Sequence, residues 1–157
     1  MTAFLETLEN LGLSTCVRES PSKLAYPTIL WLHVIGMGVV AGISAVISLR
    51  LLGVSPKTPV QPLERLYPLI WWGFGVNAVT GTALLLASAS KRLVDPTFYV
   101  KMVFIFVGVA VLQLTRNKVF RRLGPDGMPP DSAKALAWAS LFCWLGAVTA
   151  GRLLAYI

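Results

Sequence analysis

Residues 24–53, LAYPTILWLHVIGMGVVAGISAVISLRLLG, form a long apolar stretch. Between Leu24 and Leu49 the only readily charged side chain is His33. A helix needs about 20 apolar residues to cross a bilayer, and backbone polar groups in lipid must be paired within the segment. The stretch therefore predicts a transmembrane helix, and the charge of Arg50 at its far end can reach the headgroups.

The rest of the chain repeats this pattern. Of its 157 residues, 55% are apolar and 13% are charged, which is too apolar for a soluble domain. Residues 2–12 alternate apolar and polar faces, as in a helix lying on a membrane surface. The sequence predicts an all-α fold in one domain, residues 1–157: a four-helix antiparallel transmembrane bundle with an N-terminal amphipathic surface helix at 2–12 and spans at about 24–53, 67–90, 97–119 and 132–156.

The net charge of +7 comes from basic residues in short segments beside the spans, so it indicates orientation and contact with lipid rather than nucleic-acid binding. One side of the predicted bundle carries Arg50, Lys57, Arg65, Arg116, Lys118, Arg121, Arg122 and Lys134; the other carries Arg18, Lys23, Lys91, Arg92, Lys101 and Arg152. Basic residues favour the cytoplasm. We therefore expect a multi-pass protein of a bacterial inner membrane with both termini outside the cytoplasm.

Small residues at helical spacing predict where the spans pack, because transmembrane helices approach closely through such positions. The first span carries Gly38, Gly42 and Ala45 on a face different from that of His33. The second carries Gly73, Asn77, Thr80, Gly81 and Ser88, and the fourth carries Ser140, Cys143, Ala147 and Ala150. The sequence therefore predicts that these three stripes face other helices, with Asn77 as a hydrogen-bonding group between them.

His33 is the candidate centre of a polar site. It lies roughly 13 Å along the helix from Leu24, and Lys101 and Arg152 enter the predicted bundle from the same side. Ionisable groups inside a span usually face the interior or a cavity. We expect His33 to be a ligand or hydrogen-bonding group, Lys101 and Arg152 to hold an anionic group, and Tyr99 and Asn77 to complete the site. In the alternative, both cations extend to the headgroups and His33 bonds a backbone carbonyl or Asn77.

Several blocks spread along the chain resemble a bacterial family of small four-span membrane proteins, classed as a domain of unknown function. They are Arg18-Glu19-Ser20, Tyr26-Pro27, His33 with Gly36 and Gly42, the run from Leu49 to Gly53, Trp72-Gly73-Phe74, Thr80-Gly81, Pro96-Thr97-Phe98 with Lys101, the run from Val119 to Arg122, Ala150-Gly151-Arg152 and Ala155-Tyr156. The resemblance implies four spans and no established activity. Members of that family often carry a histidine near the position of Arg116, and this chain has none there.

Two functions compete on these residues. The small size, the packing stripes and the lack of an enzyme motif favour a non-catalytic accessory or anchor subunit of a larger membrane complex related to electron transfer, whose partners are lipid and other subunits or a second copy. The alternative is a bundle that binds b-type haem, quinone or lipid. A single histidine excludes bis-histidine ligation within one chain, so Met102 or a second chain would have to complete a haem site. No G-x-S-x-G motif suggests a hydrolase.

Overall fold

The computed structural model of the chain describes residues 25–122, 129–130, 132–154 and 156, and within them every regular element is a helix. The four long helices are α3 (Ala25–Leu51), α4 (Tyr67–Leu86), α6 (Pro96–Lys118) and α7 (Ser132–Leu153). Shorter helical segments adjoin them: η1 (Gln61–Leu66), α5 (Ala89–Arg92) and η2 (Phe120–Arg122). The predicted surface helix at 2–12 lies outside the described residues.

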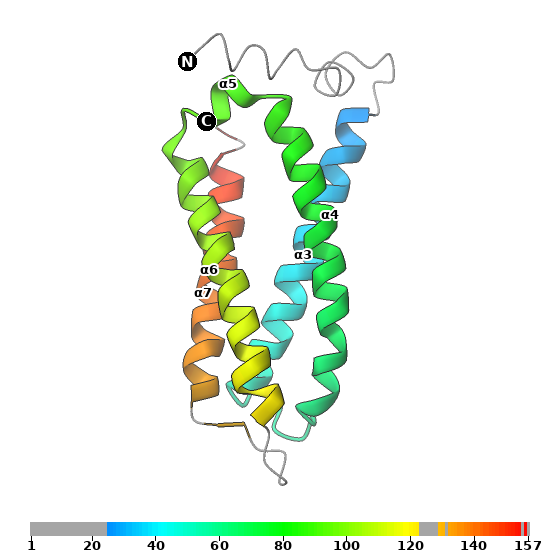
Figure 1. The fold of residues 1–157 in the computed structure, drawn as a ribbon, viewed down its shortest axis with the longest axis vertical. Helices are drawn as coiled ribbons and strands as arrows, with labels where there is room; N and C mark the ends of the chain where they lie inside the picture. The colour runs from blue at the N-terminus through cyan, green and yellow to red at the C-terminus, as the bar shows by residue number, and fades with distance from the viewer. Residues whose placement is uncertain (1–24, 123–128, 131, 155, 157) are drawn as a thin grey trace.

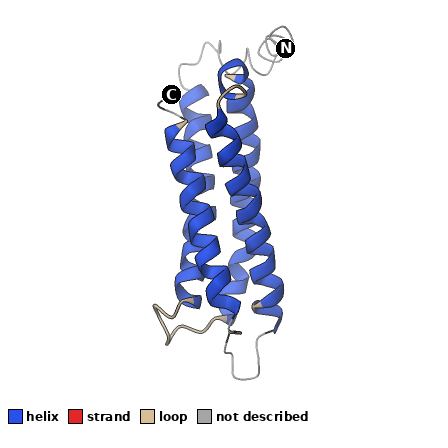
Figure 2. Ribbon diagram, turned by 90° about the vertical axis from the view of Figure 1, so that its left-hand side faces the viewer, coloured by secondary structure: helices blue, strands red, loops and turns tan. Residues whose placement is uncertain are grey.

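The long helices run side by side and alternate in direction (Figures 1 and 2). All four are long and apolar enough to cross a membrane, and this is the architecture of a multi-pass membrane protein. Large apolar side chains cover the outside, including Trp31, Trp72 and Val79, each more than 70% exposed. A bilayer accommodates such a surface, whereas water does not. The predicted four-helix fold is therefore confirmed.

The predicted spans agree with the helices to within a few residues at most ends. α3 ends where Gly53 adopts a φ of 92°, with the Val54 amide bonded to the Leu49 carbonyl at 3.1 Å, an arrangement that suits glycine. α6 begins after Asp95, whose carboxylate accepts the Thr97 amide at 2.8 Å. The second span differs most at its end, because α4 stops at Leu86 and a turn at residues 87–88 separates it from α5.

The helices pack unevenly. α3 packs along α4, α6 packs along α7, and α3 and α7 join the two pairs. α4 and α6 are not among the closely packed pairs of the described residues. The bundle thus has one loosely packed flank, which we call the α4–α6 seam.

The packing stripes were predicted well for two helices and wrongly for one. Those of α4 and α7 are largely buried, including Gly73, Asn77 and Ala147. On α3, Gly38 and Gly42 are exposed, and a methyl group at either would meet nothing within 4 Å. The buried face of α3 is instead the one that His33 shares with Val40 and Ser44. The Ser44 hydroxyl is satisfied there by the Val40 carbonyl at 2.6 Å.

α3 meets α4 through two other glycines. A Cβ atom on Gly36 would lie 2.9 Å from the Gly73 carbonyl oxygen, and one on Gly73 would lie 2.9 Å from Val39. Both distances are shorter than van der Waals contact, so only glycine permits the two backbones to come this close. This crossing fixes the part of α4 that carries Asn77 and Thr80 beside α3.

Candidate ligand groove

His33 projects from α3 toward α4, where two polar groups hold its ring. Its Nδ1 atom lies 3.2 Å from the Asn77 carbonyl oxygen and 3.1 Å from the Thr80 hydroxyl. Gly81 leaves room for the ring, since a Cβ atom there would lie 3.0 Å from the His33 Cε1 atom. The histidine therefore has a defined position inside the bundle.

These partners also determine which nitrogen carries the proton. A backbone carbonyl only accepts hydrogen bonds, so the contact with Asn77 requires a hydrogen on Nδ1. The Thr80 hydroxyl donates to the Val76 carbonyl at 2.7 Å, which leaves its oxygen to accept from His33. In a neutral imidazole the other nitrogen, Nε2, then carries a lone pair and accepts hydrogen bonds.

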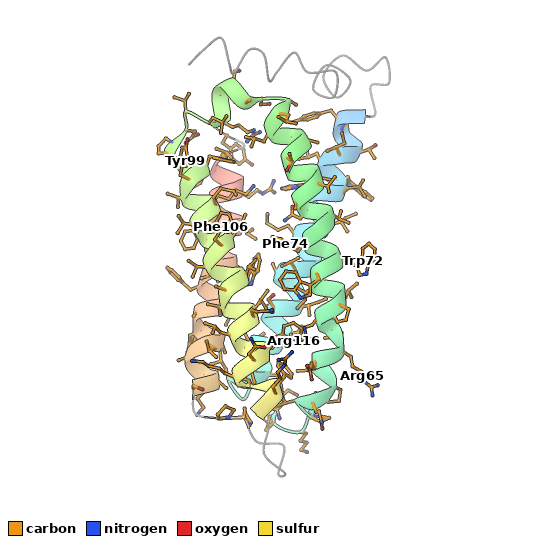
Figure 3. The ribbon with its side chains drawn as sticks, viewed as in Figure 1. Arg65, Trp72, Phe74, Tyr99, Phe106 and Arg116 are labelled. Carbon is orange, nitrogen blue, oxygen red and sulfur yellow. The ribbon has the colours of Figure 1, made fainter. Side chains whose placement is uncertain are left out.

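A groove of about 220 Å³ opens along the α4–α6 seam beside this histidine. Its wall is mainly apolar, with Phe74 from α4 and Phe106 from α6 (Figure 3). The lining residues are His33, Phe74, Asn77, Ala78, Gly81, Thr82, Leu85, Phe98, Lys101, Met102, Ile105 and Phe106. Because Ala78, Thr82 and Phe106 are exposed on the outside of the bundle, the groove is accessible from the lipid.

A second cavity, of about 110 Å³, lies next to the groove, toward the end of the bundle where α3 begins and α7 ends (Figure 1). We call it the mouth. It shares His33, Gly81, Leu85, Phe98 and Lys101 with the groove and adds Arg92 and Gly151 to its lining. The groove and the mouth are thus adjacent, with His33 and Lys101 in the walls of both.

Two cations line this space, and none of its described lining residues is acidic. Lys101 lines both cavities, close to Gly151. Arg92 donates from Nη1 to the Leu154 carbonyl at 3.4 Å, and its buried Nε atom has no hydrogen-bond partner among the described residues. A positively charged, partly dehydrated lining of this kind favours an oxygen-rich or anionic group.

The structure brings together three of the five residues predicted for the site. His33, Lys101 and Asn77 line the groove, and Asn77 bonds His33 through its backbone carbonyl. Arg152 is exposed and lines neither cavity. Tyr99 is 55% exposed on the outer side of α6, with its hydroxyl donating to the Leu93 carbonyl at 2.9 Å (Figure 3).

Sequence reasoning missed two contributors to the site. Thr80 was assigned to packing alone, although it lies one helical turn from Asn77 and shares its face. Arg92 was counted only for orientation, because the connection between the second and third spans gave no sign of the short helix α5. The available signal was its charge in the short connection that leads into the third span, the span that carries Lys101.

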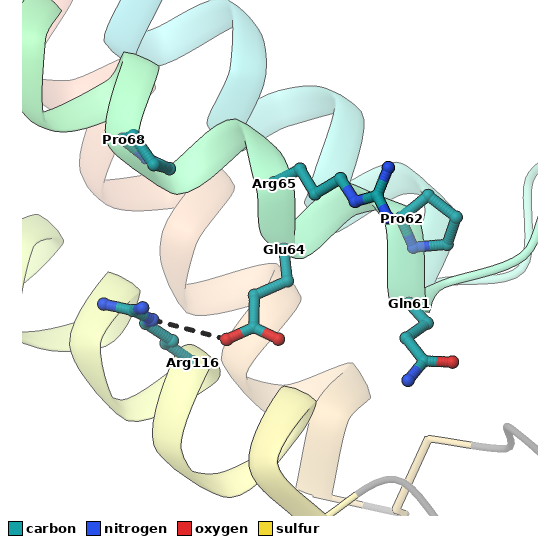
Figure 4. A pocket seen from close by; sticks show the side chains of 6 residues that line it. All are labelled: Gln61, Pro62, Glu64, Arg65, Pro68 and Arg116. Atoms are coloured by element: carbon teal, nitrogen blue, oxygen red, sulfur yellow. Dashed lines mark ion pairs between the residues drawn. The ribbon is translucent and has the colours of Figure 1, made fainter.

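A larger cavity, of about 540 Å³, lies at the opposite end of the seam and differs in chemistry (Figure 4). It is lined by Gln61, Pro62, Glu64, Arg65, Pro68 and Arg116. Arg116 and Glu64 form an ion pair with Nε and Oε1 3.5 Å apart, which is too long for a good hydrogen bond. The Arg116 guanidinium also lies 5.5 Å from the centre of the Tyr67 ring. One of its two arginines thus has an acidic partner, whereas no described residue that lines the groove is acidic.

No family model matches the chain, and comparison with curated proteins and with solved structures found no match. The resemblance to a four-span family stays a prediction.

Proposed function

We propose that this protein binds a bilayer-soluble ligand with an apolar tail and an oxygen-bearing head, the chemistry shared by quinones and by simple lipids. The observation that carries the proposal is the groove at the α4–α6 seam. Its wall is mainly apolar, and His33 and Lys101 line it where it adjoins the mouth. Ligand sites commonly combine an apolar cavity with a few convergent polar groups.

The size and position of the groove suit one ring or one chain. Its volume of about 220 Å³ is below the usual range for larger ligands, roughly 300 to 1,000 Å³, so it holds a head and the first part of a tail. Met102 and Ile105 line the path between the head position and Phe106, which is 67% exposed toward lipid. The rest of the tail would stay in the bilayer.

The polar end supplies both kinds of hydrogen bond. The Lys101 ammonium donates to a head oxygen, and a hydrogen bond involving a charged group is stronger than one between neutral groups. His33 offers Nε2, and Arg92 at the mouth favours a head with negative charge or electron-rich oxygens. The protein thereby binds and orients the head; this proposal assigns it no chemical step.

Haem fits these residues poorly. His33 and Met102 both line the groove, so two ligand types are present. A haem macrocycle is larger than the groove, however, and α4 and α6 would have to separate further to admit it. We therefore favour the smaller ligand class.

A binding titration tests the proposal. The protein is purified through a tag without histidine, stripped of lipid in detergent, and titrated with a short-chain quinone and, separately, with a phosphatidic acid. Lys101→Met should weaken binding of the preferred ligand at least tenfold, about 1.4 kcal/mol, because a charge-assisted hydrogen bond is lost. Lys134→Met, an exposed lysine near the other end of the bundle, is the matched control and should change nothing. Equal affinity of both variants, or no binding of either ligand to the wild type, contradicts the proposal.

Variants of two arginines at the same end of the bundle test whether the ligand binds at the groove and mouth or at the site predicted from the sequence. Arg92 lines the mouth, whereas Arg152 lines neither cavity. Arg92→Gln should therefore weaken binding of phosphatidic acid, and Arg152→Gln should leave it unchanged. The reverse result would restore Arg152 to the site.

The role as an accessory subunit of an electron-transfer complex stays a prediction, as does placement in a bacterial inner membrane with both termini outside the cytoplasm. The basic residues at the end of the bundle opposite the mouth support that orientation. A cysteine introduced at Gly127 should resist labelling from outside intact cells, and efficient labelling would reverse the topology.

A further inference from the structure

The hydrogen bonds of His33 restrict what its free nitrogen can bind, and this carries an inference that rests on the proposed function. We propose that the site selects ligands whose head carries a hydroxyl group, and so prefers a hydroquinone to the corresponding quinone. His33 Nε2 would accept the hydroxyl hydrogen, and Lys101 would donate to a head oxygen.

The orientation of the ring is set from three sides. The Asn77 carbonyl and the Thr80 oxygen both lie within 3.2 Å of Nδ1, and the backbone of Gly81 adjoins Cε1. Turning the ring over would place a carbon atom against both acceptors. The turned ring would lose the hydrogen bonds from Nδ1 to both oxygens, which is unfavourable, so Nδ1 stays the protonated nitrogen.

The surrounding charge keeps the imidazole neutral. A protonated His33 would be a third positive charge beside Lys101 and Arg92, and none of the described residues that line the groove or the mouth is acidic. Nε2 therefore presents a lone pair rather than a hydrogen, and a group that only accepts hydrogen bonds cannot pair with it.

This pairing of one donor, Lys101, with one acceptor, His33 Nε2, distinguishes the two redox forms of a quinone. The oxygens of a quinone are carbonyls, which accept from Lys101 but have no hydrogen for Nε2. Each hydroxyl of a hydroquinone donates and accepts, so it can satisfy both side chains. The site thus recognises a hydroxylated ring by having one donor and one acceptor, and it needs no redox step to do so.

The test measures binding of a matched pair, one short-chain hydroquinone and its quinone, to the delipidated wild type under anaerobic conditions. We expect about tenfold tighter binding of the hydroquinone, as for one net hydrogen bond. Lys101→Met should weaken the binding of both forms, and the hydroquinone should still bind more tightly than the quinone. His33→Gln should make the affinities for hydroquinone and quinone nearly equal, because a side-chain amide can rotate to donate to a carbonyl or to accept from a hydroxyl.

A second measurement reads the histidine directly. The chain has one histidine, so ¹⁵N labelling of histidine yields a single pair of ring signals. We expect Nδ1 to be protonated and Nε2 not, with the Nε2 signal moving when hydroquinone is added. A protonated Nε2, or equal binding of the two forms by the wild type, overturns the selectivity. If the two forms bind equally, the proposed function still stands; if neither they nor a phosphatidic acid bind, the proposed function fails as well.

Discussion

α4 has two neighbours and packs against them in different ways. Toward α3 it is held along its length, with Gly36 and Gly73 at a crossing too close for any other residue. Toward α6 it is held mainly near its first turn, and beyond that point the groove opens. The two sides of α4 differ because small residues on one side let backbones meet, while on the other large side chains must bridge a gap.

At the opposite end of the seam, where the larger cavity lies, Tyr67 bridges α4 and α6, and we call this the bridged end. The Tyr67 ring is 1% exposed and packs edge-on against Phe120 with the ring centres 5.5 Å apart. Its hydroxyl donates to the Leu112 carbonyl of α6 at 3.3 Å, and Arg116 lies over its face. At the groove, the described residues of α4 and α6 show no comparable bridge.

The difference matters because the membrane provides no hydrophobic force between helices. Apolar side chains lose nothing by facing lipid, so a seam closes only where packing or polar contacts pull its helices together. A lipid-facing groove can therefore persist at one end while Tyr67 holds the other.

Removing Tyr67 should have the largest effect on this comparison. Tyr67→Ala deletes a buried ring at the bridged end, and we expect a loss of about 3–5 kcal/mol in the free energy of unfolding. Tyr67→Phe keeps the ring and loses only the bond to Leu112, which should cost about 1 kcal/mol. Unfolding in mixed micelles measures both, and equal losses would show that the hydroxyl rather than the ring holds the seam.

A substitution at the crossing of Gly36 and Gly73 should have the next largest effect on stability. Gly36→Ala places a methyl group 2.9 Å from the Gly73 carbonyl oxygen, and we expect a loss of about 1–3 kcal/mol as the helices move apart. Gly38→Ala, two residues away on α3, meets open space and is the matched control. It should be neutral or gain up to about 1 kcal/mol, because alanine favours a helix over glycine. Equal thermal stability of the two variants in detergent would contradict the crossing.

The ion pair between Glu64 and Arg116 at the bridged end should contribute less to stability. Glu64 and Arg116 are each about one-third exposed, and pairs of this kind contribute less than about 1 kcal/mol. Glu64→Gln should lower stability by no more than that, and high salt should remove the difference between variant and wild type. If Glu64→Gln lost as much stability as Tyr67→Ala, the ion pair rather than the ring would hold α4 and α6 together at this end.

Filling the groove should have the smallest effect on stability and a clear effect on binding. Ala78 is exposed and lines the groove, so Ala78→Leu adds bulk where no helix packs. We expect stability to change by less than about 0.5 kcal/mol, and ligand affinity to fall. Ala110→Leu, an exposed position of α6 that lines neither cavity, should leave both unchanged. Undiminished affinity in the Ala78 variant would place the ligand elsewhere.

Part of the site was predictable because ionisable groups are rare in spans. His33 and Lys101 stand out in apolar segments, and their depth follows from counting helical residues. Arg152 lines neither cavity, because depth along a helix does not specify which way a side chain points. The hydrogen bond from His33 to a backbone carbonyl, weighed as an alternative to a ligand site, is present, and it orients the ring rather than excluding a ligand.

The sequence by itself determined the all-helical fold, the four spans and their approximate ends, because length and hydropathy decide what crosses a bilayer. Only the tertiary structure decided which faces meet. Small residues occur on both faces of α3, and apolar residues cover both the inside and the outside of a membrane bundle, so composition does not mark the interior. Gly36 rather than Gly42 packs on α4, and the seam beside His33 stays open, because backbone approach and the reach of Tyr67 are properties of helices placed together.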